Sequence, residues 1–349
     1  MPKNSDSILT PSKPTIRDIA QICGVSEATV SYVINGKRVL KPETRARVQQ
    51  VIRDLNYHPS AMARGLNRKS VQTIGVFFGV VVTRELMVNP YSSGILSGIF
   101  AEAAHENLNV TLYTASWENA AVSAPPFSDG RSDGVIMVAP TLESGIVEGL
   151  FATGTPIVGI STGKSEIAPD VDVDNYAGLQ MATQHLLNLG HRRIAFIMGD
   201  SDLAAFAPRK AGFCDVMQQA GIAVVPEFLI ISTFGGQLAR EQTRKLLQHA
   251  QPPTAIVTAN DAIAMAVLEA AREMGVNVPG DLSVVGFDDN AVASQSTPGL
   301  TTVHQPLFEI GATAAKLLVN LIRDSRLEEN CHLLPPELVV RGSTARNKF

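Results

Sequence analysis

The sequence predicts a small α-helical domain at the N-terminus, followed by a large α/β region that divides into two lobes. Three observations lead to this fold class. The chain has 349 residues, and hydrophobic cores usually split into separate domains beyond ~250 residues. Residues 15–58 show helical patterns only. From Thr73 onward, short apolar runs alternate with helical stretches, which is typical of parallel sheets covered by helices on both faces.

The first predicted helix begins after Thr15, whose hydroxyl can cap a helix. Asp18 stands three residues further on, the spacing of a capping box in which each side chain bonds the other residue's backbone. Ile16, Ile19 and Cys23 continue an apolar stripe at helical spacing. Gly24 follows as a stop signal.

The second and third helices complete a helix-turn-helix with its supporting helix. Ser26 is the expected N-cap of the second helix, which runs to about Ile34 and stops at Asn35-Gly36. Pro42 sits in the first turn of the third helix, which runs to about Asn56. Two helices joined by a tight glycine-containing turn are the defining feature of this motif.

The α/β region alternates strand and helix throughout. Strands are expected at Thr73–Phe78, Val110–Tyr113, Gly134–Val138, Pro156–Ile160, Arg193–Met198, Phe228–Ile231, Ala255–Thr258 and Leu282–Phe287. Helices are expected at Ser92–Asn107, Ala177–Leu189, Ala211–Ala220, Gln237–His249, Ala262–Met274 and Leu307–Leu321. Ligands of such folds bind at the carboxyl ends of the strands, so the expected pocket lies between the lobes.

Charge is divided unevenly along the chain. Residues 1–70 contain twelve Lys and Arg against five Asp and Glu, whereas the remainder contains seventeen against twenty-eight. A basic segment favours a polyanionic partner, although a solvated basic surface is equally compatible with charge alone. Residues 1–14 are polar and contain three prolines, which predicts a disordered tail.

Composition excludes several classes of protein. No apolar run approaches the ~20 residues that span a bilayer, so we expect a soluble protein with no membrane partner. The first residues lack the apolar core and cleavage site of a signal peptide, which indicates a cytoplasmic protein. The three cysteines lie far apart, which favours reduced, mostly buried thiols over disulfides or a metal site.

Two stretches carry a resemblance to a known family. TIRDIAQICGVSEATVSYVINGK (residues 15–37) and PETRARVQQVIRDLNYHPSAMARGL (residues 42–66) closely resemble the headpiece and hinge helix of the lac/gal repressor family. The resemblance continues to RGSTA near the C-terminus. It divides the chain into the tail (1–14), a DNA-binding headpiece (15–58), a hinge helix and linker (59–70), and a two-lobed, periplasmic-binding-protein-like effector-binding and dimerisation region (71–349).

The resemblance implies that the second helix enters the major groove of DNA. Glu27, Ala28 and Tyr32 then occupy the base-reading positions. A glutamate can accept a hydrogen bond from cytosine, an alanine can contact a thymine methyl group, and a tyrosine can donate or stack. The matching phosphate-contacting or supporting positions are Thr15, Ser26, Thr29, Ser31, Asn35, Thr44 and Tyr57. Ser26 fits a plain helix cap equally well.

The tract from Pro59 to Leu66 is too short to hold an isolated helix. We expect it to fold when it pairs with its dimer mate on DNA. By resemblance, Leu66 is a minor-groove wedge, Ala63 allows close approach, and Arg64 lies nearby. Inserted apolar side chains of this kind kink DNA. The plainer interpretation of Leu66 is an apolar residue in a linker.

The remaining family motifs are VDVDNYAG (171–178), HLLNLGHRRIAFIMG (185–199), PRKAGF (208–213), TANDAIAM (258–265), SVVGFDD (283–289) and TPGLTTVHQP (297–306). They place Arg209 and Asp288 in the effector pocket, where a guanidinium and a carboxylate suit a hydroxyl-rich ligand. The further expected effector contacts are Tyr91, Ser161, Phe234, Asn260 and Gln305. Each of them can also be merely structural, and the alignment of Phe234 crosses a variable loop.

Departures from the family pattern bear on the effector. Ser161 stands where several relatives have Asp, and Val138 stands where the lac branch of the family has a sugar-contacting Asn. A simple galactoside is therefore not expected. A sugar or glycoside is the first expectation for the effector, and a nucleobase or nucleoside is the alternative.

An enzyme and a free-standing sugar-binding protein are the other classes to weigh. The chain has no Walker A pattern, no GxGxxG after a strand and no GxSxG elbow. None of its seven histidines has HxxxH or HExxH spacing. The pairs Asp172/Asp174 and Asp288/Asp289 are expected to point in different directions. We therefore expect no catalysis, cofactor or metal. A sugar-binding protein fits Thr73 onward but leaves the headpiece unexplained.

The expected mechanism is that of a homodimeric repressor on a near-palindromic double-stranded DNA operator. Effector binding closes or rotates the lobes and thereby makes or melts the paired hinge helices. Whether the effector acts as inducer or corepressor, and whether binding represses or activates, stays open at this point. RGSTARNKF continues into no heptad segment, so a dimer is expected rather than a coiled-coil tetramer.

Overall fold

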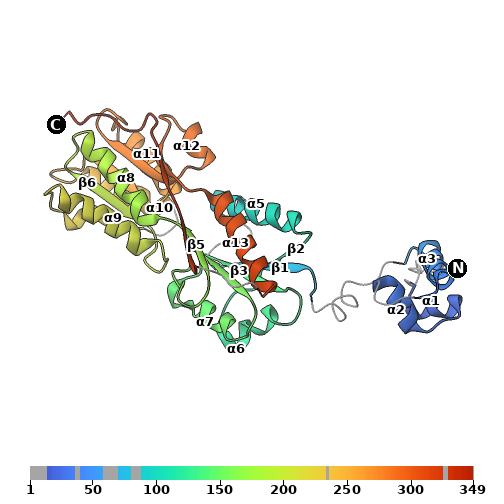
Figure 1. The fold of residues 1–349 in the computed structure, drawn as a ribbon. Helices are drawn as coiled ribbons and strands as arrows, with labels where there is room; N and C mark the ends of the chain where they lie inside the picture. The colour runs from blue at the N-terminus through green and yellow to red at the C-terminus, as the bar shows by residue number, and fades with distance from the viewer. Residues whose placement is uncertain are drawn as a thin grey trace, which may run out of the picture. The chain divides into compact units, whose positions relative to one another are not determined.

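The computed structural model describes residues 14–35, 40–57, 70–79, 88–232, 236–324 and 329–348. The chain divides into two compact units, Met1–Val71 and Gln72–Phe349 (Figure 1). The expected tail and hinge helix fall almost entirely outside the described residues.

The headpiece contains the three expected helices. They are α1 (Ile16–Cys23), α2 (Glu27–Asn35) and α3 (Pro42–Asp54). Their shared core consists of Ile19, Ala20, Cys23, Val30, Val33 and Val48. Helix α3 ends two residues before the expected Asn56, because Asn56 has a φ of 47°. That left-handed conformation, which asparagine tolerates well, does not continue an α-helix.

Local hydrogen bonds determine where α1 and α2 begin. Thr15 and Asp18 form the predicted capping box: the Thr15 N–H donates to Asp18 Oδ2 at 2.7 Å, and the Asp18 N–H donates to Thr15 Oγ1 at 3.3 Å. Gly24 ends α1 at a φ of 59°. The Thr29 N–H then donates to Ser26 Oγ at 3.2 Å, so Ser26 caps the second helix.

The second unit consists of two lobes, each built on a six-stranded sheet. The strands of lobe 1 follow the order β11-β5-β4-β3-β1-β2, and those of lobe 2 the order β12-β10-β9-β8-β6-β7. Lobe 1 contains β1 (Thr73–Phe78), β2 (Asn109–Tyr113), β3 (Gly134–Val138), β4 (Ile157–Ile160), β5 (Asp170–Val173) and β11 (Cys331–Leu334). Lobe 2 contains β6 (Ile194–Met198), β7 (Leu229–Ile231), β8 (Ala255–Thr258), β9 (Ser283–Asp288), β10 (Thr301–His304) and β12 (Glu337–Val339).

All neighbouring strands are parallel except β12, which pairs antiparallel with β10. The central strands β3, β4, β6 and β8 are buried along their whole length. Parallel strands are covered by helices on both faces, which explains why these segments read as continuous apolar runs.

Helices α5 (Pro90–His105), α6 (Ala120–Ser123), α7 (Ile146–Phe151) and α13 (Leu307–Ile322) belong to lobe 1. Helices α8 (Asn175–Asn188), α9 (Phe206–Gln219), α10 (Gly236–Leu247), α11 (Asp261–Glu273) and α12 (Ala291–Gln295) belong to lobe 2. Short 3-10 turns lie at η2 (Pro125–Phe127), η3 (Leu142–Ser144) and η4 (Pro226–Phe228). Helix α9 begins five residues before its expected start at Ala211, because Pro208 is tolerated in a first turn, where its missing N–H is not needed.

The chain passes between the lobes three times, after β5, after β10 and between β11 and β12. Helix α13 thus returns from lobe 2 and packs against α5 of lobe 1 (Figure 1). Two glycines permit this close packing: a Cβ at Gly98 would lie 1.9 Å from the Phe308 carbonyl oxygen, and one at Gly311 would lie 2.1 Å from that of Ile95.

The predicted cysteine environment was partly wrong. All three cysteines are free, and Cys23 is buried as expected. Cys214 is half-buried and Cys331 is exposed, because β11, which carries Cys331, is the edge strand of the lobe 1 sheet.

Candidate nucleic-acid interface and small-molecule site

Helix α2 presents the predicted base-reading residues on its exposed side. Glu27 and Ala28 are exposed in the first turn. Tyr32 lies one turn beyond Ala28 and is 36% exposed. Residues four apart share one face of a helix, so Ala28 and Tyr32 lie side by side. Val30 and Val33 point into the headpiece core, whereas Ala28 and Tyr32 do not belong to that core.

Several predicted phosphate-contacting residues already take part in the headpiece structure. Thr15 is the N-cap of α1. The Ser26 and Thr29 hydroxyls lie 2.9 Å apart in a hydrogen bond. Ser31 and Thr44 are half-buried, and Tyr57 packs against the core. The structure gives the Asn35 backbone only, and Ala63, Arg64 and Leu66 lie outside the described residues.

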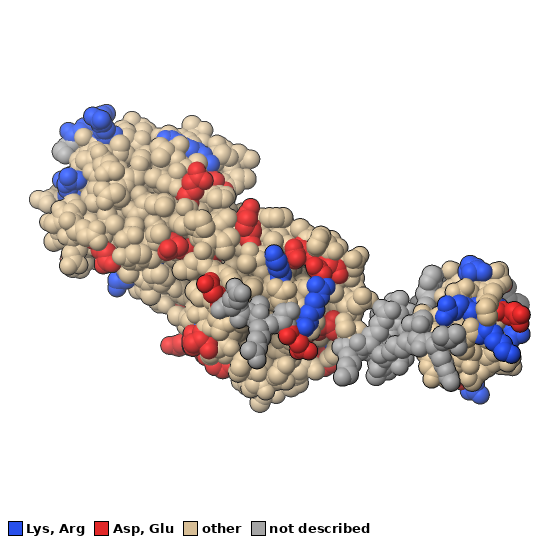
Figure 2. Space-filling view, in the orientation of Figure 1, with Lys and Arg blue, Asp and Glu red and all other residues tan. Residues whose placement is uncertain are grey.

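The charge asymmetry is visible on the surface (Figure 2). The face shown of the headpiece carries several Lys and Arg side chains, whereas Asp and Glu are frequent on the face shown of lobe 1. Arg17, Arg45, Arg47 and Arg53 are exposed cations of α1 and α3. This distribution suits a polyanion at the headpiece.

The predicted effector contacts of lobe 1 belong to one hydrogen-bonded chain. The Tyr91 hydroxyl, at the start of α5, lies 3.1 Å from Ser161 Oγ, directly after β4. Ser161 Oγ donates to Asp172 Oδ1 at 2.8 Å. Asn175, at the start of α8, donates from Nδ2 to Asp172 Oδ2 at 3.0 Å. Asp172 and Asn175 were not predicted as site residues.

Arg209 continues this chain into lobe 2. Its Nε donates to Asn175 Oδ1 at 2.7 Å, and one terminal nitrogen donates to the Ala259 carbonyl oxygen, directly after β8. The guanidinium carbon lies 3.8 Å from the centre of the Phe287 ring. Contacts on three sides hold the guanidinium in one position, and the aromatic face favours the cation.

Asp288 and Gln305 form the other end of the site. Gln305 Nε2 donates to Asp288 Oδ1 at 2.5 Å, and both side chains are buried. Asp288 is the last residue of β9, and Gln305 directly follows the neighbouring strand β10. Asp288 has a φ of 123° and Ser161 a φ of 53°, conformations that non-glycine residues rarely adopt and that cluster at functional sites.

Burial dominates the electrostatics of the cluster formed by Tyr91, Ser161, Asp172, Asn175, Arg209, Asp288 and Gln305, which we call the polar cluster. Desolvation raises the pKa of Asp172 to about 7, although its bond from Ser161 acts in the opposite direction. Desolvation and the neighbouring Asp261 raise the pKa of Asp288 to about 7. Desolvation also lowers the pKa of Arg209, opposed by Asp288 and Asp172. The pKa of each of these groups therefore depends on the charges of its neighbours in the polar cluster.

Two predicted effector residues, Asn260 and Phe234, are not among the residues of the polar cluster. Asn260 Oδ1 accepts the Ile263 N–H at 2.8 Å, which makes it the N-cap of α11. This N-cap hydrogen bond is structural, and the adjacent Ala259 carbonyl belongs to the site through Arg209. Phe234 lies outside the described residues.

The sequence VDVDN contained the missed signal for Asp172 and Asn175. Val171 and Val173 are buried on β5, so Asp172 alternates to the other side of the strand. A polar residue in that position, at the carboxyl end of a parallel strand, lies where ligands of this architecture bind.

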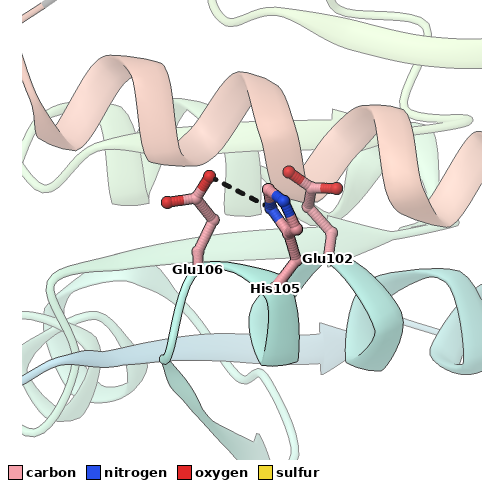
Figure 3. A group of neighbouring side chains, drawn as sticks. All are labelled: Glu102, His105 and Glu106. Carbon is pink, nitrogen blue, oxygen red and sulfur yellow. Dashed lines mark ion pairs between the residues drawn. The ribbon is translucent and has the colours of Figure 1, made fainter.

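A separate group of Glu102, His105 and Glu106 lies at the end of α5, with ligand atoms within 4.8 Å of one another (Figure 3). Such a group can hold a metal ion, although its sequence, EAAHE, has neither HxxxH nor HExxH spacing. His105 Nδ1 lies 3.4 Å from Glu106 Oε1, and Glu106 also pairs with Arg323. The pairing with Arg323 occupies one of the two carboxylates.

A hollow of about 150 Å³ opens at the other end of β6. Its lining includes Arg192 and Arg193, beside Met217 and Phe228. Both guanidinium groups already donate to backbone carbonyl oxygens. No residue predicted for the effector lines this hollow.

A helix-turn-helix domain on the same chain as a two-lobed parallel α/β unit with a polar cluster at its strand ends defines a class of proteins: ligand-responsive transcription regulators. Comparison with known protein families gives the same class. Residues 15–60 match the model "Bacterial regulatory proteins, lacI family", and residues 183–344 match the model "Periplasmic binding protein-like domain".

Three similar proteins extend the match over almost the whole chain. The HTH-type transcriptional repressor PurR of Photobacterium profundum is 32% identical over 335 residues, which cover 94% of this chain and 98% of that protein. The Lac repressor dimer bound to operator and the anti-inducer ONPF matches with a TM-score of 0.82 and 26% identity, covering 95% of this chain and 99% of that chain. A complex of the transcriptional regulator CelR with cellobiose matches with a TM-score of 0.73 and 29% identity, covering 95% of this chain and 99% of that chain.

This chain belongs to the lacI family of bacterial regulatory proteins and is a DNA-binding transcriptional regulator. The expected family, fold class and general function are thereby confirmed. Its relatives named above are transcription regulators rather than enzymes. None of the helices in the described ranges has the length and apolar character needed to cross a membrane.

Proposed function

We propose that this chain is a cytoplasmic, non-enzymatic repressor that binds a near-palindromic operator as a homodimer. Its effector is a sugar or glycoside, and binding of the effector lowers or raises the affinity for the operator. The polar cluster is the observation that carries the effector part of this proposal. It combines hydrogen-bond donors and acceptors from both lobes, at the carboxyl ends of their strands.

The exposed face of α2 supports operator reading. Glu27, Ala28 and Tyr32 can contact base edges, whereas the caps at Thr15 and Ser26 hold the two helices of the motif in register. The similarity to a Lac repressor dimer on its operator supports a homodimer, since two headpieces match two half-sites of a near-palindrome.

The charge balance of the polar cluster supports an uncharged, hydroxyl-rich effector. Arg209 supplies a positive charge, and burial raises the pKa of both Asp172 and Asp288, which disfavours two full negative charges beside it. A neutral ligand leaves this balance undisturbed, and each group can bond hydroxyls. The CelR complex contains such a ligand, cellobiose. A nucleobase or nucleoside, which offers ring nitrogens and hydroxyls to the same groups, is the second candidate.

Three measurements test this function. Selection of bound sequences from random duplexes identifies the operator, for which we expect a two-fold repeat. Thermal shift screening of neutral sugars, glycosides and nucleosides then identifies ligands that raise the melting temperature. An effector must also change operator affinity in a fluorescence anisotropy titration, because it acts only through unequal affinity for the two states.

The outcomes separate the parts of the proposal. Stabilisation by a nucleoside but by no sugar would replace the effector class and leave the regulator intact. A stabilising sugar that leaves operator affinity unchanged would contradict ligand control. Binding to all duplexes with equal affinity would contradict operator recognition by α2.

A further inference from the structure

One turn of lobe 1 is hydrogen-bonded to one residue of lobe 2. The turn η3 follows β3, and Asp202 lies in the loop that follows β6. The Leu142 N–H donates to the Asp202 carbonyl oxygen at 2.9 Å. The next amide, that of Glu143, donates to Asp202 Oδ1 at 3.3 Å. Asp202 thus accepts two consecutive backbone N–H groups from the other lobe.

The lobes also touch beside these hydrogen bonds. A Cβ placed at Gly163, which follows β4, would lie 3.0 Å from Ala204 Cβ and 3.5 Å from Leu142 Cδ2. Gly163 has a φ of 65°. Residues 163 and 204 therefore lie in direct contact across the lobes, and a side chain at Gly163 requires a shift of only a few tenths of an ångström.

Both partners of this contact are held in place within their own lobe. In lobe 1, the Trp117 indole N–H donates to the Ser144 carbonyl oxygen at 2.9 Å, and Ser144 Oγ donates to the Thr141 carbonyl oxygen at 2.6 Å. In lobe 2, the Asp202 N–H donates to Asp200 Oδ1 at 3.1 Å. The contact therefore joins two segments that are each held by hydrogen bonds within their own lobe.

The contact lies away from the strands where the chain crosses between the lobes. The crossings leave β5, β10 and β11, which are the edge strand or its neighbour in each sheet, whereas β6 is separated from β10 by β8 and β9. When the lobes open by rotating about the crossings, the segments farthest from the crossings move the most, and these include the contact between η3 and Asp202. The Asp202 loop also leads directly into α9, whose first turn carries Arg209 of the polar cluster.

We propose that Asp202 is a latch that holds the two lobes closed before any effector binds. The latch rests on the proposed function only in that the polar cluster is taken as the enclosed site. Its two hydrogen bonds must break before the lobes separate and the effector exchanges. Because the Asp202 loop continues into α9, effector contacts at Arg209 and closure of the latch stabilise the same arrangement.

Disulfide trapping tests closure without effector or DNA. Gly163→Cys and Ala204→Cys are introduced in a full-length chain in which Cys214 and Cys331 are replaced by Ser, and cross-linking by diamide is timed. The latch is removed by Leu142→Pro with Asp202→Ala. Proline fits this position, because Thr141 before it has φ −70° and ψ 145° and Leu142 begins a helical turn.

The matched control is Leu142→Ala with Asp202→Asn, which keeps the Leu142 N–H and an oxygen acceptor at residue 202. We expect cross-linking roughly tenfold slower without the latch than in the control, since two hydrogen bonds no longer favour closure. Equal rates in the two backgrounds would overturn the proposal. Neither rate depends on the effector or the operator, so failure of the proposed function leaves this result unaffected.

Amide exchange in the unaltered chain provides a second measurement if the cysteine pair disturbs folding at Gly163. The amides of Leu142 and Glu143 should exchange at least roughly tenfold more slowly than in a free peptide, because both are hydrogen-bonded across the lobes. Exchange of both amides at the free-peptide rate would show that the latch is open in solution and would overturn the proposal.

Discussion

Arg209 connects the two ends of the polar cluster through donors that point in different directions. It bonds Asn175 and the Ala259 carbonyl while its guanidinium lies against Phe287. A lysine retains the charge but has neither the planar shape nor the fork of donors. Arg209 is therefore the residue at which charge and geometry can be separated experimentally.

We expect Arg209→Lys to weaken effector binding roughly 10- to 100-fold, the range expected for losing a hydrogen bond to a charged group. Operator affinity without effector should stay within about twofold. Calorimetry with a ligand found by thermal shift measures the first effect, and anisotropy measures the second. Arg131→Lys, at an exposed ion pair, is the control. Unchanged effector affinity would remove Arg209 from the site.

The raised pKa of Asp172 predicts a pH dependence of stability. Its folded pKa of about 7 lies above the ordinary value of 3.8, so the folded chain keeps a proton that the unfolded chain releases in between. Stability should therefore fall as pH rises through that window. The lowered pKa values of His185 and His191 act in the opposite direction below pH 6.5, so only a comparison of variants isolates the carboxyl.

In Asp172→Asn, the fall in melting temperature between pH 5 and pH 7.5 should be smaller by a few degrees than in the unaltered chain, at ~2–4 °C per kcal/mol. Asp288 still titrates, so part of the slope remains. Scanning calorimetry at a series of pH values measures it, with Glu118→Gln on the surface as control. Parallel curves for the chain and Asp172→Asn would contradict this assignment.

At the level of residues, resemblance predicted more of the site than local pattern did. Arg209, Asp288 and Gln305 were placed by motifs, and the structure brings them close to Tyr91 and Ser161. Asp172 was missed because acids two apart were considered only as a catalytic pair. Asn260 was predicted to contact ligand, yet its side chain caps α11, and a linear motif does not distinguish these two roles of an asparagine.

At the level of elements, the N-terminus of α1 shows how a predicted DNA contact can also determine folding. The Thr15 side chain and the Asp18 side chain each satisfy a backbone donor of the other. Unpaired N–H groups at a helix start are costly, and a lost cap typically costs about 1 kcal/mol.

Thr15→Ala should therefore speed amide exchange in the first turn of α1 roughly fivefold, since about 1 kcal/mol of capping is lost. Thr15→Ser keeps the hydroxyl and should exchange like the unaltered chain. Exchange followed by NMR on the full chain gives the comparison. If both variants exchanged equally fast, the capping box would not hold in solution.

The strands and helices missed in the sequence are all short, with no more than six residues each. The strand β5 has the sequence DVDV, β10 has TTVH, and β11 and β12 are edge strands. Strands as short as these gain their stability from pairing with neighbours, which a linear pattern does not display. The longer apolar strands were found because burial on both faces leaves a continuous hydrophobic run.

At the level of the whole molecule, the predicted hinge links operator binding to the lobes. Leu66, in a segment outside the described residues, is proposed to insert into the minor groove at the centre of the operator. A wedge of this kind contributes only when both headpieces occupy their half-sites.

Leu66→Ala should weaken operator binding roughly tenfold or more, because the bent DNA loses its apolar insertion. Binding to random duplex should change less than about twofold, since phosphate contacts dominate there. Anisotropy titrations at one fixed salt concentration measure both affinities. Leu66→Met keeps an apolar side chain and serves as control. Equal losses on operator and random DNA would contradict a wedge.

The three crossings between the lobes have a consequence for the order in which this chain can fold during synthesis. Lobe 1 begins at Thr73, but its helix α13 and strand β11 come from residues 307–334. Lobe 2 closes its sheet with β12 and holds the final residues through His191, which bonds the Ala345 carbonyl. Residues up to 334 must therefore be synthesised before lobe 1 can complete its core, and residues up to 339 before lobe 2 can complete its sheet. Chains truncated before residue 307 should therefore contain two incomplete lobes, which makes them aggregation-prone substrates for chaperones and proteases.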